Sequence, residues 1–283
     1  MPEDADLIEA KRGEMLAVNR EQRRYYERAT GSKESVANSL ATNLWRRVRQ
    51  RVFGALGSAG VPDSVRTLHR AWLGDISRRR LLDLGVGDGN LLSLELAEGA
   101  GRYTAIDLSQ PRLDRFRERL TEAGILGAEL LAVDFLSPEF TGCDYDVIYA
   151  MSVLHHFKHP DALLEVLHRR LSPTGQVVTY DPLEIWLPAR LARSLYRPFQ
   201  TDRAWEYPFT KRTLRIIQKY FDVTHVQGFY GRSKWAALAG ITSTDLAGRL
   251  ARRWHVYDLD HANSLTSVGS SLHISLHLTK RRT

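Results

Sequence analysis

The sequence predicts an α/β fold with a seven-stranded, mostly parallel sheet, helices on both faces, a helical region at the N-terminus and a helical insertion after strand five. In residues 81–97 a short apolar run leads into a glycine-rich turn and then into a segment of helical composition. Residues 79–182 alternate short β-rich runs with helical stretches, which is typical of a parallel sheet covered by helices. Two further β-rich runs follow in the C-terminal part, and they bring the expected strands to seven.

The central segment divides into five strands and three helices. The strands are expected where apolar and β-branched residues are concentrated, at residues 81–84, 102–107, 128–133, 145–150 and 176–180. The helices are expected at residues 90–98, 109–123 and 161–171. Pro111 lies at an early helical position, where its fixed φ is favourable, and Gly124 closes the same helix. Residues 173–175, Pro-Thr-Gly, predict a turn before the fifth strand.

The flanking parts of the chain predict a division into two domains. Residues 1–78 are rich in Ala, Leu, Arg and Glu, and they predict a helical cap or substrate-binding region. Residues 79–283 are expected to form the sheet domain, with its insertion at about 183–209. In the C-terminal part we expect helices at 211–220 and 233–254 and strands at 221–226 and 272–278.

The glycine turn is the most informative motif, and it reads Asp-Leu-Gly-Val-Gly-Asp-Gly over residues 83–89. Glycine at every second position lets the backbone turn sharply and lets a ligand lie directly on the main chain. A dinucleotide-binding fingerprint needs its third glycine three residues after the second, where this chain has Asn90. Ligands of such sheets bind beyond the carboxyl ends of the strands, so the residues there form the candidate site.

Asp107 is the strongest candidate at a strand end. It closes the second strand about twenty residues after the glycine turn. From this position a carboxylate can accept hydrogen bonds from both hydroxyls of a ribose. Alternatively, Asp107 could only stabilise the N-terminus of the helix that begins near Ser109, because acidic residues are common at helix N-termini. The glycine turn at the appropriate distance favours ribose binding.

With these motifs the chain resembles the class I S-adenosylmethionine-dependent methyltransferases, in their small-molecule branch. The resemblance covers about residues 79–182 and is carried by the glycine turn, Asp107, the Asp134-Phe135 pair after the third strand, and the segments 145–157 and 171–178. It implies S-adenosyl-L-methionine as the cofactor and the seven-stranded fold of that family. It also implies that the last strand lies antiparallel between the fifth and sixth strands.

The resemblance further implies a role for several individual residues. Asp134 would accept a hydrogen bond from the adenine amino group and Phe135 would pack on the ring, whereas the alternative is a loop acid beside a core phenylalanine. Asp83 would lie near the methionine amino group, and Met151 would meet the methionyl portion through its backbone. The remaining residues expected to bind the cofactor are Gly85, Gly87, Gly89, Leu108 and, on an N-terminal helix that closes over the site, Tyr26.

The chemistry of methyl transfer makes modest demands on the protein. The methyl group of a sulfonium is already activated, so the enzyme has mainly to align acceptor, methyl and sulfur. A general base is needed only if the acceptor is protonated at neutral pH. The candidates near the carboxyl ends of the fourth and fifth strands are His155, His156, His159 and Asp181. Alternatively, the paired histidines only pack against the cofactor or cap a helix.

The acceptor is expected to be a small molecule, namely an apolar metabolite, a natural product or a lipid. After the fourth strand, nucleic-acid amino-methyltransferases carry an Asn/Asp-Pro-Pro-aromatic motif, whereas residues 150–153 read Ala-Met-Ser-Val here. This argues against a nucleic-acid acceptor, although the arginine clusters keep an RNA methyltransferase open as an alternative. The fold could also serve another reaction, such as cyclisation, or a regulatory protein without turnover.

The insertion after the fifth strand contains an amphipathic helix. One helical face carries Leu187, Leu191, Leu195 and Phe199, and arginines lie largely off it. The helix could be a lid over an apolar acceptor, an interfacial helix that contacts an anionic membrane through residues 186–199, or a cover for the core edge. The aromatic residues at 205–209 are expected to line an apolar pocket.

Composition limits the remaining possibilities. The chain of 283 residues has 43% hydrophobic residues, a net charge of +7 and a pI of about 9.6, which fits either solvated basic faces or an anionic partner. The single cysteine, Cys143, excludes an internal disulfide, and the histidine spacing predicts no metal site. With no signal peptide and no apolar run long enough for a bilayer, we expect a cytoplasmic protein. The oligomeric state stays open.

Overall fold

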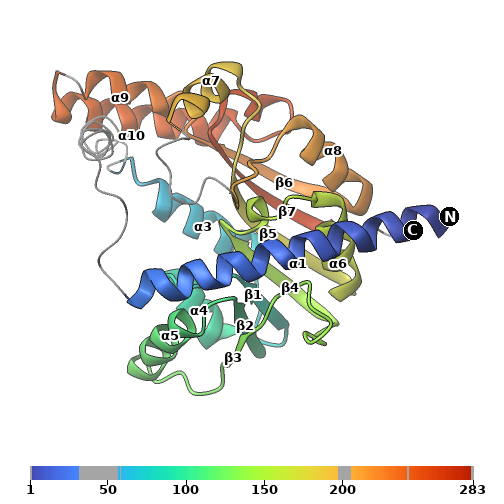
Figure 1. Ribbon diagram of the computed structural model, residues 1–283. Coiled ribbons are helices and arrows are strands. Elements are labelled where there is room, and N and C mark those ends of the chain that lie inside the picture. The colour runs from blue at the N-terminus through green and yellow to red at the C-terminus, as the bar shows by residue number, and fades with distance from the viewer. Residues whose placement is uncertain (1, 32–56, 58, 197–204, 241, 282–283) are drawn as a thin grey trace.

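The computed structural model describes residues 2–31, 57, 59–196, 205–240 and 242–281 (Figure 1). Its sheet contains β1 (Arg80–Leu84), β2 (Arg102–Asp107), β3 (Glu129–Ala132), β4 (Tyr145–Met151), β5 (Leu171–Pro182), β6 (Phe221–Phe229) and β7 (His273–Lys280). The spatial order of the strands is β3-β2-β1-β4-β5-β7-β6. The helices are α1 (Pro2–Gly31), α3 (Val61–Leu73), α4 (Leu91–Gly99), α5 (Gln110–Glu122), η1 (Leu154–His156), α6 (Pro160–Arg170), α7 (Leu187–Tyr196), α8 (Lys211–Tyr220), η4 (Ser233–Trp235), α9 (Ala236–Ala239), α10 (Thr244–His261) and η5 (Ser267–Ser270).

β7 differs in direction from the other strands. It pairs antiparallel with β5 and with β6, whereas the other neighbouring strands pair in parallel. The predicted seven-stranded sheet and the position of its last strand are therefore confirmed. Because β1 to β6 run in one direction, their carboxyl ends meet at the same edge of the sheet, where ligands of such folds bind.

Helices cover both faces of the sheet because alternate strand residues point to opposite sides. On one face, buried residues of α3, α4 and α5 join Leu81 and Val147 in an apolar cluster. On the other face, buried residues of α1, α6 and α8 meet Leu82 and Ile148. The expected layers are thus confirmed, and the first half of the sheet agrees with the prediction to within one or two residues per element.

The start of β5 differs from the prediction. Residues 173–175 were expected to form a turn, yet the strand already begins at Leu171, which pairs with Tyr145 of β4. The next pair joins Gln176 to Val147, so four residues of β5 lie opposite one residue of β4. The prediction of a turn before the fifth strand is wrong, because the Pro-Thr-Gly sequence forms an irregularity within the strand pairing.

The prediction of one continuous helix at 233–254 is also wrong. The chain there forms η4 and α9, and then starts again as α10. The restart has a local cause, since the side chain of Ser243 accepts a hydrogen bond from the backbone N–H of Leu246 and so caps α10.

α1 crosses the sheet domain beside α6 (Figure 1). Arg23 donates to the backbone oxygen of Ala132, the last residue of β3, over 3.3 Å, and Arg12 donates to that of Leu136 over 2.8 Å. Lys11 of the same helix forms an ion pair with Asp161 of α6. These contacts fix α1 over the carboxyl end of β3.

α7 is the described helix of the predicted insertion. Leu187 and Leu191 are 60% and 59% exposed, so this part of the apolar face does not cover the core edge. The side chain of Leu195 and all of Phe199 lie outside the described residues. No helix in the described part of the chain combines the length and apolar character needed to cross a membrane.

Candidate active site

The glycine turn joins β1 to α4 in a conformation that side chains would obstruct. Gly85, Gly87 and Gly89 all have positive φ, between 57° and 72°. A Cβ at Gly85 would lie 2.5 Å from a methyl group of Val153, and one at Gly89 would lie 2.1 Å from the ring of Phe116. The close approach of Val153 to Gly85 and of Phe116 to Gly89, together with the positive φ angles, explains why glycine occupies these positions.

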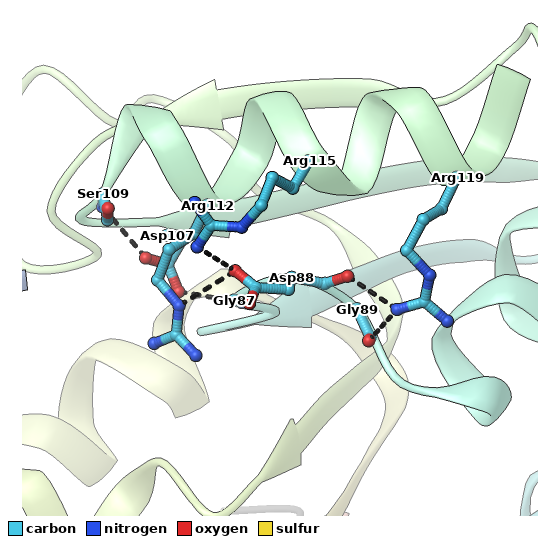
Figure 2. Close-up of polar contacts among 8 residues, drawn as sticks. All are labelled: Gly87, Asp88, Gly89, Asp107, Ser109, Arg112, Arg115 and Arg119. Atoms are coloured by element: carbon cyan, nitrogen blue, oxygen red, sulfur yellow. Dashed lines mark hydrogen bonds and ion pairs between the residues drawn. The ribbon is translucent and has the colours of Figure 1, made fainter. Parts of the chain in front are cut away.

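Three arginines of α5 hold the same turn from the outside (Figure 2). Arg112 and Arg115 donate to Oδ1 of Asp88 over 3.2 and 2.8 Å, and Arg119 donates to the backbone oxygens of Asp88 and Gly89. At the other end, Asn90 caps α4 by accepting from two backbone N–H groups. The backbone N–H groups of the turn are thereby presented in a fixed arrangement.

Asp107 closes β2 directly beside the turn (Figure 2). The backbone N–H of Gly87 donates to its Oδ2 and that of Ser109 donates to its Oδ1, each over 2.9 Å. Burial raises the pKa of this carboxyl group, and these two hydrogen bonds oppose the rise. Asp107 thus supports the start of α5, as the alternative interpretation expects, and also orients a carboxylate toward the turn.

Asp134 follows β3 and is held by two donors. Its Oδ1 accepts from the backbone N–H of Leu136 over 2.9 Å and from Nδ2 of Asn19, on α1, over 3.1 Å. Burial raises the pKa of Asp134, and both donors oppose that rise. The neighbouring Phe135 is buried in the core on the α1 side of the sheet. The acid is therefore fixed by α1 as well as by its own loop.

These strand ends and α1 enclose one cavity. Seven of its lining residues were predicted as site residues, namely Tyr26, Gly85, Asp107, Leu108, Asp134, Phe135 and His156. The lining residues that the prediction missed include Asn19, Gln22, Arg112, Ser152 and Val153.

Gln22 supplies the clearest sign that the cavity receives a ligand. Its side chain is 4% exposed, and its Nε2 has no hydrogen-bond partner among the described residues. A buried donor without an acceptor is costly, so an acceptor is expected in the cavity that this side chain lines. Asn19, Gln22 and Tyr26 recur at helical spacing on α1, a signal of a polar helix face that the sequence contained.

Six predicted site residues do not line this cavity: Asp83, Gly87, Gly89, Met151, His155 and Asp181. Gly87 and Gly89 shape the turn, and Met151 ends β4. Asp83 is 1% exposed and accepts a hydrogen bond from the hydroxyl of Tyr103 over 2.8 Å. Burial raises its pKa to about 7. Asp83 therefore lies beneath the turn rather than at the cavity wall.

His155 and Asp181 form a buried pair next to the cavity. Nδ1 of His155 lies 2.9 Å from Oδ1 of Asp181, and the backbone N–H of His155 donates to the same oxygen over 3.1 Å. The hydroxyl of Thr179 donates to Oδ2 of Asp181. The ring of His156 lies 4.1 Å from that of His155, between centroids, and its Nδ1 lies 3.0 Å from the backbone oxygen of Trp205.

A second cavity, of about 490 Å³, lies on the other side of η1. Phe157 lines both cavities, and the second is also lined by Tyr207, Pro208 and Phe209 of the predicted aromatic segment. Trp205 is not among its lining residues and packs instead on Tyr25 of α1. η1 and Phe157 therefore form the wall between the two cavities.

Comparison with known proteins agrees with this geometry. Residues 82–177 match the profile of a family described as a methyltransferase domain. The chain is 30% identical over 187 residues to a cypemycin N-terminal methyltransferase of a Streptomyces species, which covers 60% of this chain and 73% of that protein. It is 29% identical over 167 residues to a ubiquinone/menaquinone biosynthesis C-methyltransferase of Paraburkholderia phymatum. That match covers 53% of this chain and 68% of the relative.

A solved structure shares the fold. It is the geranyl diphosphate C-methyltransferase of Streptomyces coelicolor A3(2), in complex with Mg²⁺, geranyl diphosphate and S-adenosyl-L-homocysteine. The superposition has a TM-score of 0.56 at 14% identity and covers 78% of this chain and 79% of that one. Fold, family profile and relatives agree, and the chain belongs to the class I S-adenosylmethionine-dependent methyltransferases.

Proposed function

We propose that this enzyme transfers the methyl group of S-adenosylmethionine to a small apolar acceptor, with the cofactor bound in the cavity beneath α1. The observation that carries the proposal is the convergence of the glycine turn, Asp107 and Asp134 on one cavity. The same cavity is lined by Gln22, a buried donor without a partner among the described residues. In this proposal residues 1–78 act as a cap, and residues 79–283 form the methyltransferase domain.

The adenosine portion has the better-defined partners. Each oxygen of Asp107 receives one backbone N–H and keeps acceptor capacity for the ribose hydroxyls. The two donors to Asp134 both reach Oδ1, which leaves Oδ2 for the adenine amino group. Phe135 would pack on the base, and Gln22 would donate to it.

The methionyl portion would lie along the glycine turn and the end of β4. Gly85 and Leu108 line the cavity there, and Met151 would contribute its backbone. Tyr26 would cover this end, where its ring already lies 5.5 Å from the guanidinium of Arg112. Asp83 would act indirectly, because its carboxyl group holds Tyr103 under the turn instead of lining the cavity.

We assign His155 as the general base for an acceptor that carries a proton. The cofactor supplies a methyl group on a positively charged sulfur, so deprotonation and alignment of the acceptor are what the protein must add. Asp181 binds Nδ1 of His155 and so favours the tautomer in which Nε2 accepts protons. His156, which lines the cofactor cavity, is the second candidate for the same role.

The second cavity is the proposed acceptor site. It adjoins the cofactor cavity across Phe157. Its lining combines apolar side chains such as Leu154, Phe209 and Ile216 with charged ones such as Lys11, Asp161 and Glu184. The relative that serves ubiquinone and menaquinone biosynthesis supports an apolar acceptor. That relative and the Streptomyces protein are methyltransferases, which favours methyl transfer over cyclisation as the reaction.

The test is methyl transfer from labelled S-adenosylmethionine to a panel of phenols, quinols and isoprenoids. We expect label in at least one such acceptor, and loss of transfer in Asp107→Ala but not in the control Asp114→Ala, an exposed acid of α5. Transfer to RNA and to no small molecule would overturn the assignment of the acceptor. Unchanged activity in Asp107→Ala would overturn the assignment of the cofactor site.

A further inference from the structure

An apolar surface lies where the insertion meets the segment after β6. The rings of Trp186 and Trp235 are 5.4 Å apart in an edge-to-face arrangement, which places the start of α7 beside η4. Around this contact Leu187 and Leu191 of α7 are 60% and 59% exposed, Trp235 is 46% exposed and Leu238 of α9 is 58% exposed. We call Trp186, Leu187, Leu191, Trp235 and Leu238 the α7–α9 face.

The charge of this surface is of one sign. Residues 186–196 and 232–239, which carry the face, contain no acidic residue, and Arg190 and Arg232 are the basic residues described there as exposed. Lys234 is only 8% exposed and donates to the backbone oxygens of Gly231 and Ser270. Nζ of Lys234 lies 4.4 Å from the ring centroid of Trp186. The guanidinium of Arg232 lies 5.0 Å from the ring of Tyr257, which is 41% exposed. Apolar side chains are therefore bordered by aromatic rings and cations.

A cavity of about 370 Å³ opens between the same elements. It is lined by Trp186, Arg232, Lys234, Trp235 and Tyr257, among others. Asp258 also lines it, but its carboxylate already accepts from the backbone N–H groups of Arg232 and Ser233 and from the Ser233 hydroxyl. Indole rings beside cations are typical of protein surfaces at the level of lipid headgroups.

We propose that the α7–α9 face binds the surface of an anionic phospholipid membrane. Leucines and tryptophans grouped on one surface favour an apolar medium, which nucleic acid does not offer, and Arg190 and Arg232 complement anionic headgroups. The contact is peripheral, since no described helix can span a bilayer. Trp186 follows β5 at the edge of the sheet where Asp181 lies, so the face adjoins the catalytic side of the molecule.

The experiment is co-sedimentation of the full chain with vesicles, without cofactor or acceptor, so that it does not depend on the proposed function. Phosphatidylcholine vesicles are compared with vesicles that also contain phosphatidylglycerol, at low and high salt. We expect binding to the anionic vesicles at low salt. Binding should weaken at least about tenfold in Leu187→Asp/Leu191→Asp and roughly fivefold to tenfold in Arg190→Glu.

Matched controls carry the same substitutions on other surfaces. Leu7 and Leu126 are 54% and 84% exposed, so Leu7→Asp/Leu126→Asp should bind vesicles like the wild type. Arg20→Glu, on an exposed position of α1, should also bind normally. Circular dichroism establishes that each variant is folded, and Leu191→Ser replaces the double variant if that one unfolds.

Two results would overturn the proposal. One is wild-type protein that stays in the supernatant with anionic vesicles, or that binds them equally well with and without the α7 leucines. The other is a dimer in light scattering that Leu187→Asp/Leu191→Asp converts to a monomer, because the face would then be an interface between two copies of the chain.

Discussion

Nδ1 of His155 lies 2.9 Å from Oδ1 of Asp181, and both side chains are buried. Asp181 belongs to β5 and His155 follows β4, so the pair links the carboxyl ends of two adjacent parallel strands. η1, which contains His155, is the wall between the cofactor cavity and the proposed acceptor cavity. The pair therefore lies beside the wall between the two cavities, although neither His155 nor Asp181 lines either of them.

The first prediction concerns this pair. His155→Ala should lower kcat by about a hundredfold to ten-thousandfold for an acceptor that must lose a proton. Asp181→Asn should lower it by at least about tenfold, because Asn favours the wrong tautomer of His155. The dissociation constant of S-adenosylmethionine, measured by calorimetry, should change little in either variant.

A pH profile separates a base from a structural residue. If His155 removes the proton, the activity of His155→Ala should rise with pH as the acceptor ionises in solution. His156→Ala is the matched comparison, since its ring lies 4.1 Å from that of His155. Full activity in His155→Ala together with inactivity in His156→Ala would assign the base to His156 and overturn its assignment to His155.

The second prediction concerns the side chains of α1 that line the cofactor cavity. Asn19→Ala removes a donor to Asp134, and Gln22→Ala removes the buried donor that has no partner in the described part of the chain. Each should weaken cofactor binding by about tenfold, the value of one hydrogen bond to a buried or charged group. Glu21→Ala, on an exposed position of the same helix, should leave binding unchanged.

An analogue of the product tests the role of Asn19 more sharply. S-Inosylhomocysteine has a carbonyl oxygen in place of the adenine amino group, so an acceptor faces Asp134 where the amino group would donate. The wild type should prefer S-adenosylhomocysteine, and Asn19→Ala should lose part of this preference. An equal preference in both proteins would mean that Asn19 does not position Asp134 for the base.

The third prediction concerns the glycine turn. Gly89 and Gly124 both have positive φ, but a Cβ at Gly89 would meet the buried ring of Phe116 whereas one at Gly124 would meet nothing within 4 Å. Gly124→Ala should cost about 1 kcal/mol of unfolding free energy from backbone strain. Gly89→Ala should cost roughly 1 to 3 kcal/mol more, because the ring must move.

Urea denaturation of both glycine variants measures the difference. Calorimetry should in addition show weaker cofactor binding for Gly89→Ala and normal binding for Gly124→Ala. Equal losses of stability would show that backbone strain alone requires the glycine at position 89.

The fourth prediction concerns acid stability. His69 is buried between the Tyr149 hydroxyl and the Ser275 hydroxyl, at 3.2 and 2.8 Å, and burial lowers its pKa to about 3. The unfolded chain binds this proton near pH 6.5, so the unfolded state gains protons first as the pH falls. Stability should drop by about 1.4 kcal/mol per pH unit for this one group below about pH 6.5.

Asp83 acts in the opposite direction. Its pKa is raised to about 7, so the folded state holds this proton where the unfolded state has released it. Its contribution is present at low pH and is lost as the pH rises through about 7. Urea unfolding should therefore be measured between about pH 7 and about pH 5. The free energy of unfolding should fall less steeply with decreasing pH in His69→Gln than in the wild type, and more steeply in Asp83→Asn. Unchanged slopes would contradict both assignments.

The central part of the fold could be predicted because its signals are local. The glycine turn, Asp107 and the strand ends lie within a hundred-residue segment whose elements alternate regularly, and parallel pairing then brings them to one edge. The errors are local as well. The bulge after Leu171 and the restart of helix at Ser243 depend on pairing and capping that composition does not reveal.

The contribution of α1 and α5 to the site could not be predicted in the same way. Asn19 lies 115 residues before Asp134 in the chain, and only the packing of α1 against the end of β3 brings them together. The support of Asp88 by Arg112 and Arg115 likewise depends on how α5 lies beside the turn. The helical spacing of Asn19, Gln22 and Tyr26 could have indicated a polar face, but not what it faces.

Calorimetric titration of the wild type and of Asp107→Ala with S-adenosylmethionine tests the cofactor site most directly. We expect a dissociation constant in the micromolar range for the wild type and an affinity at least about a hundredfold lower for the variant, since both ribose hydroxyls lose their acceptor. Asp114→Ala serves as the control and should bind like the wild type. Equal affinity of the wild type and Asp107→Ala would show that the cofactor does not bind in the cavity beneath α1.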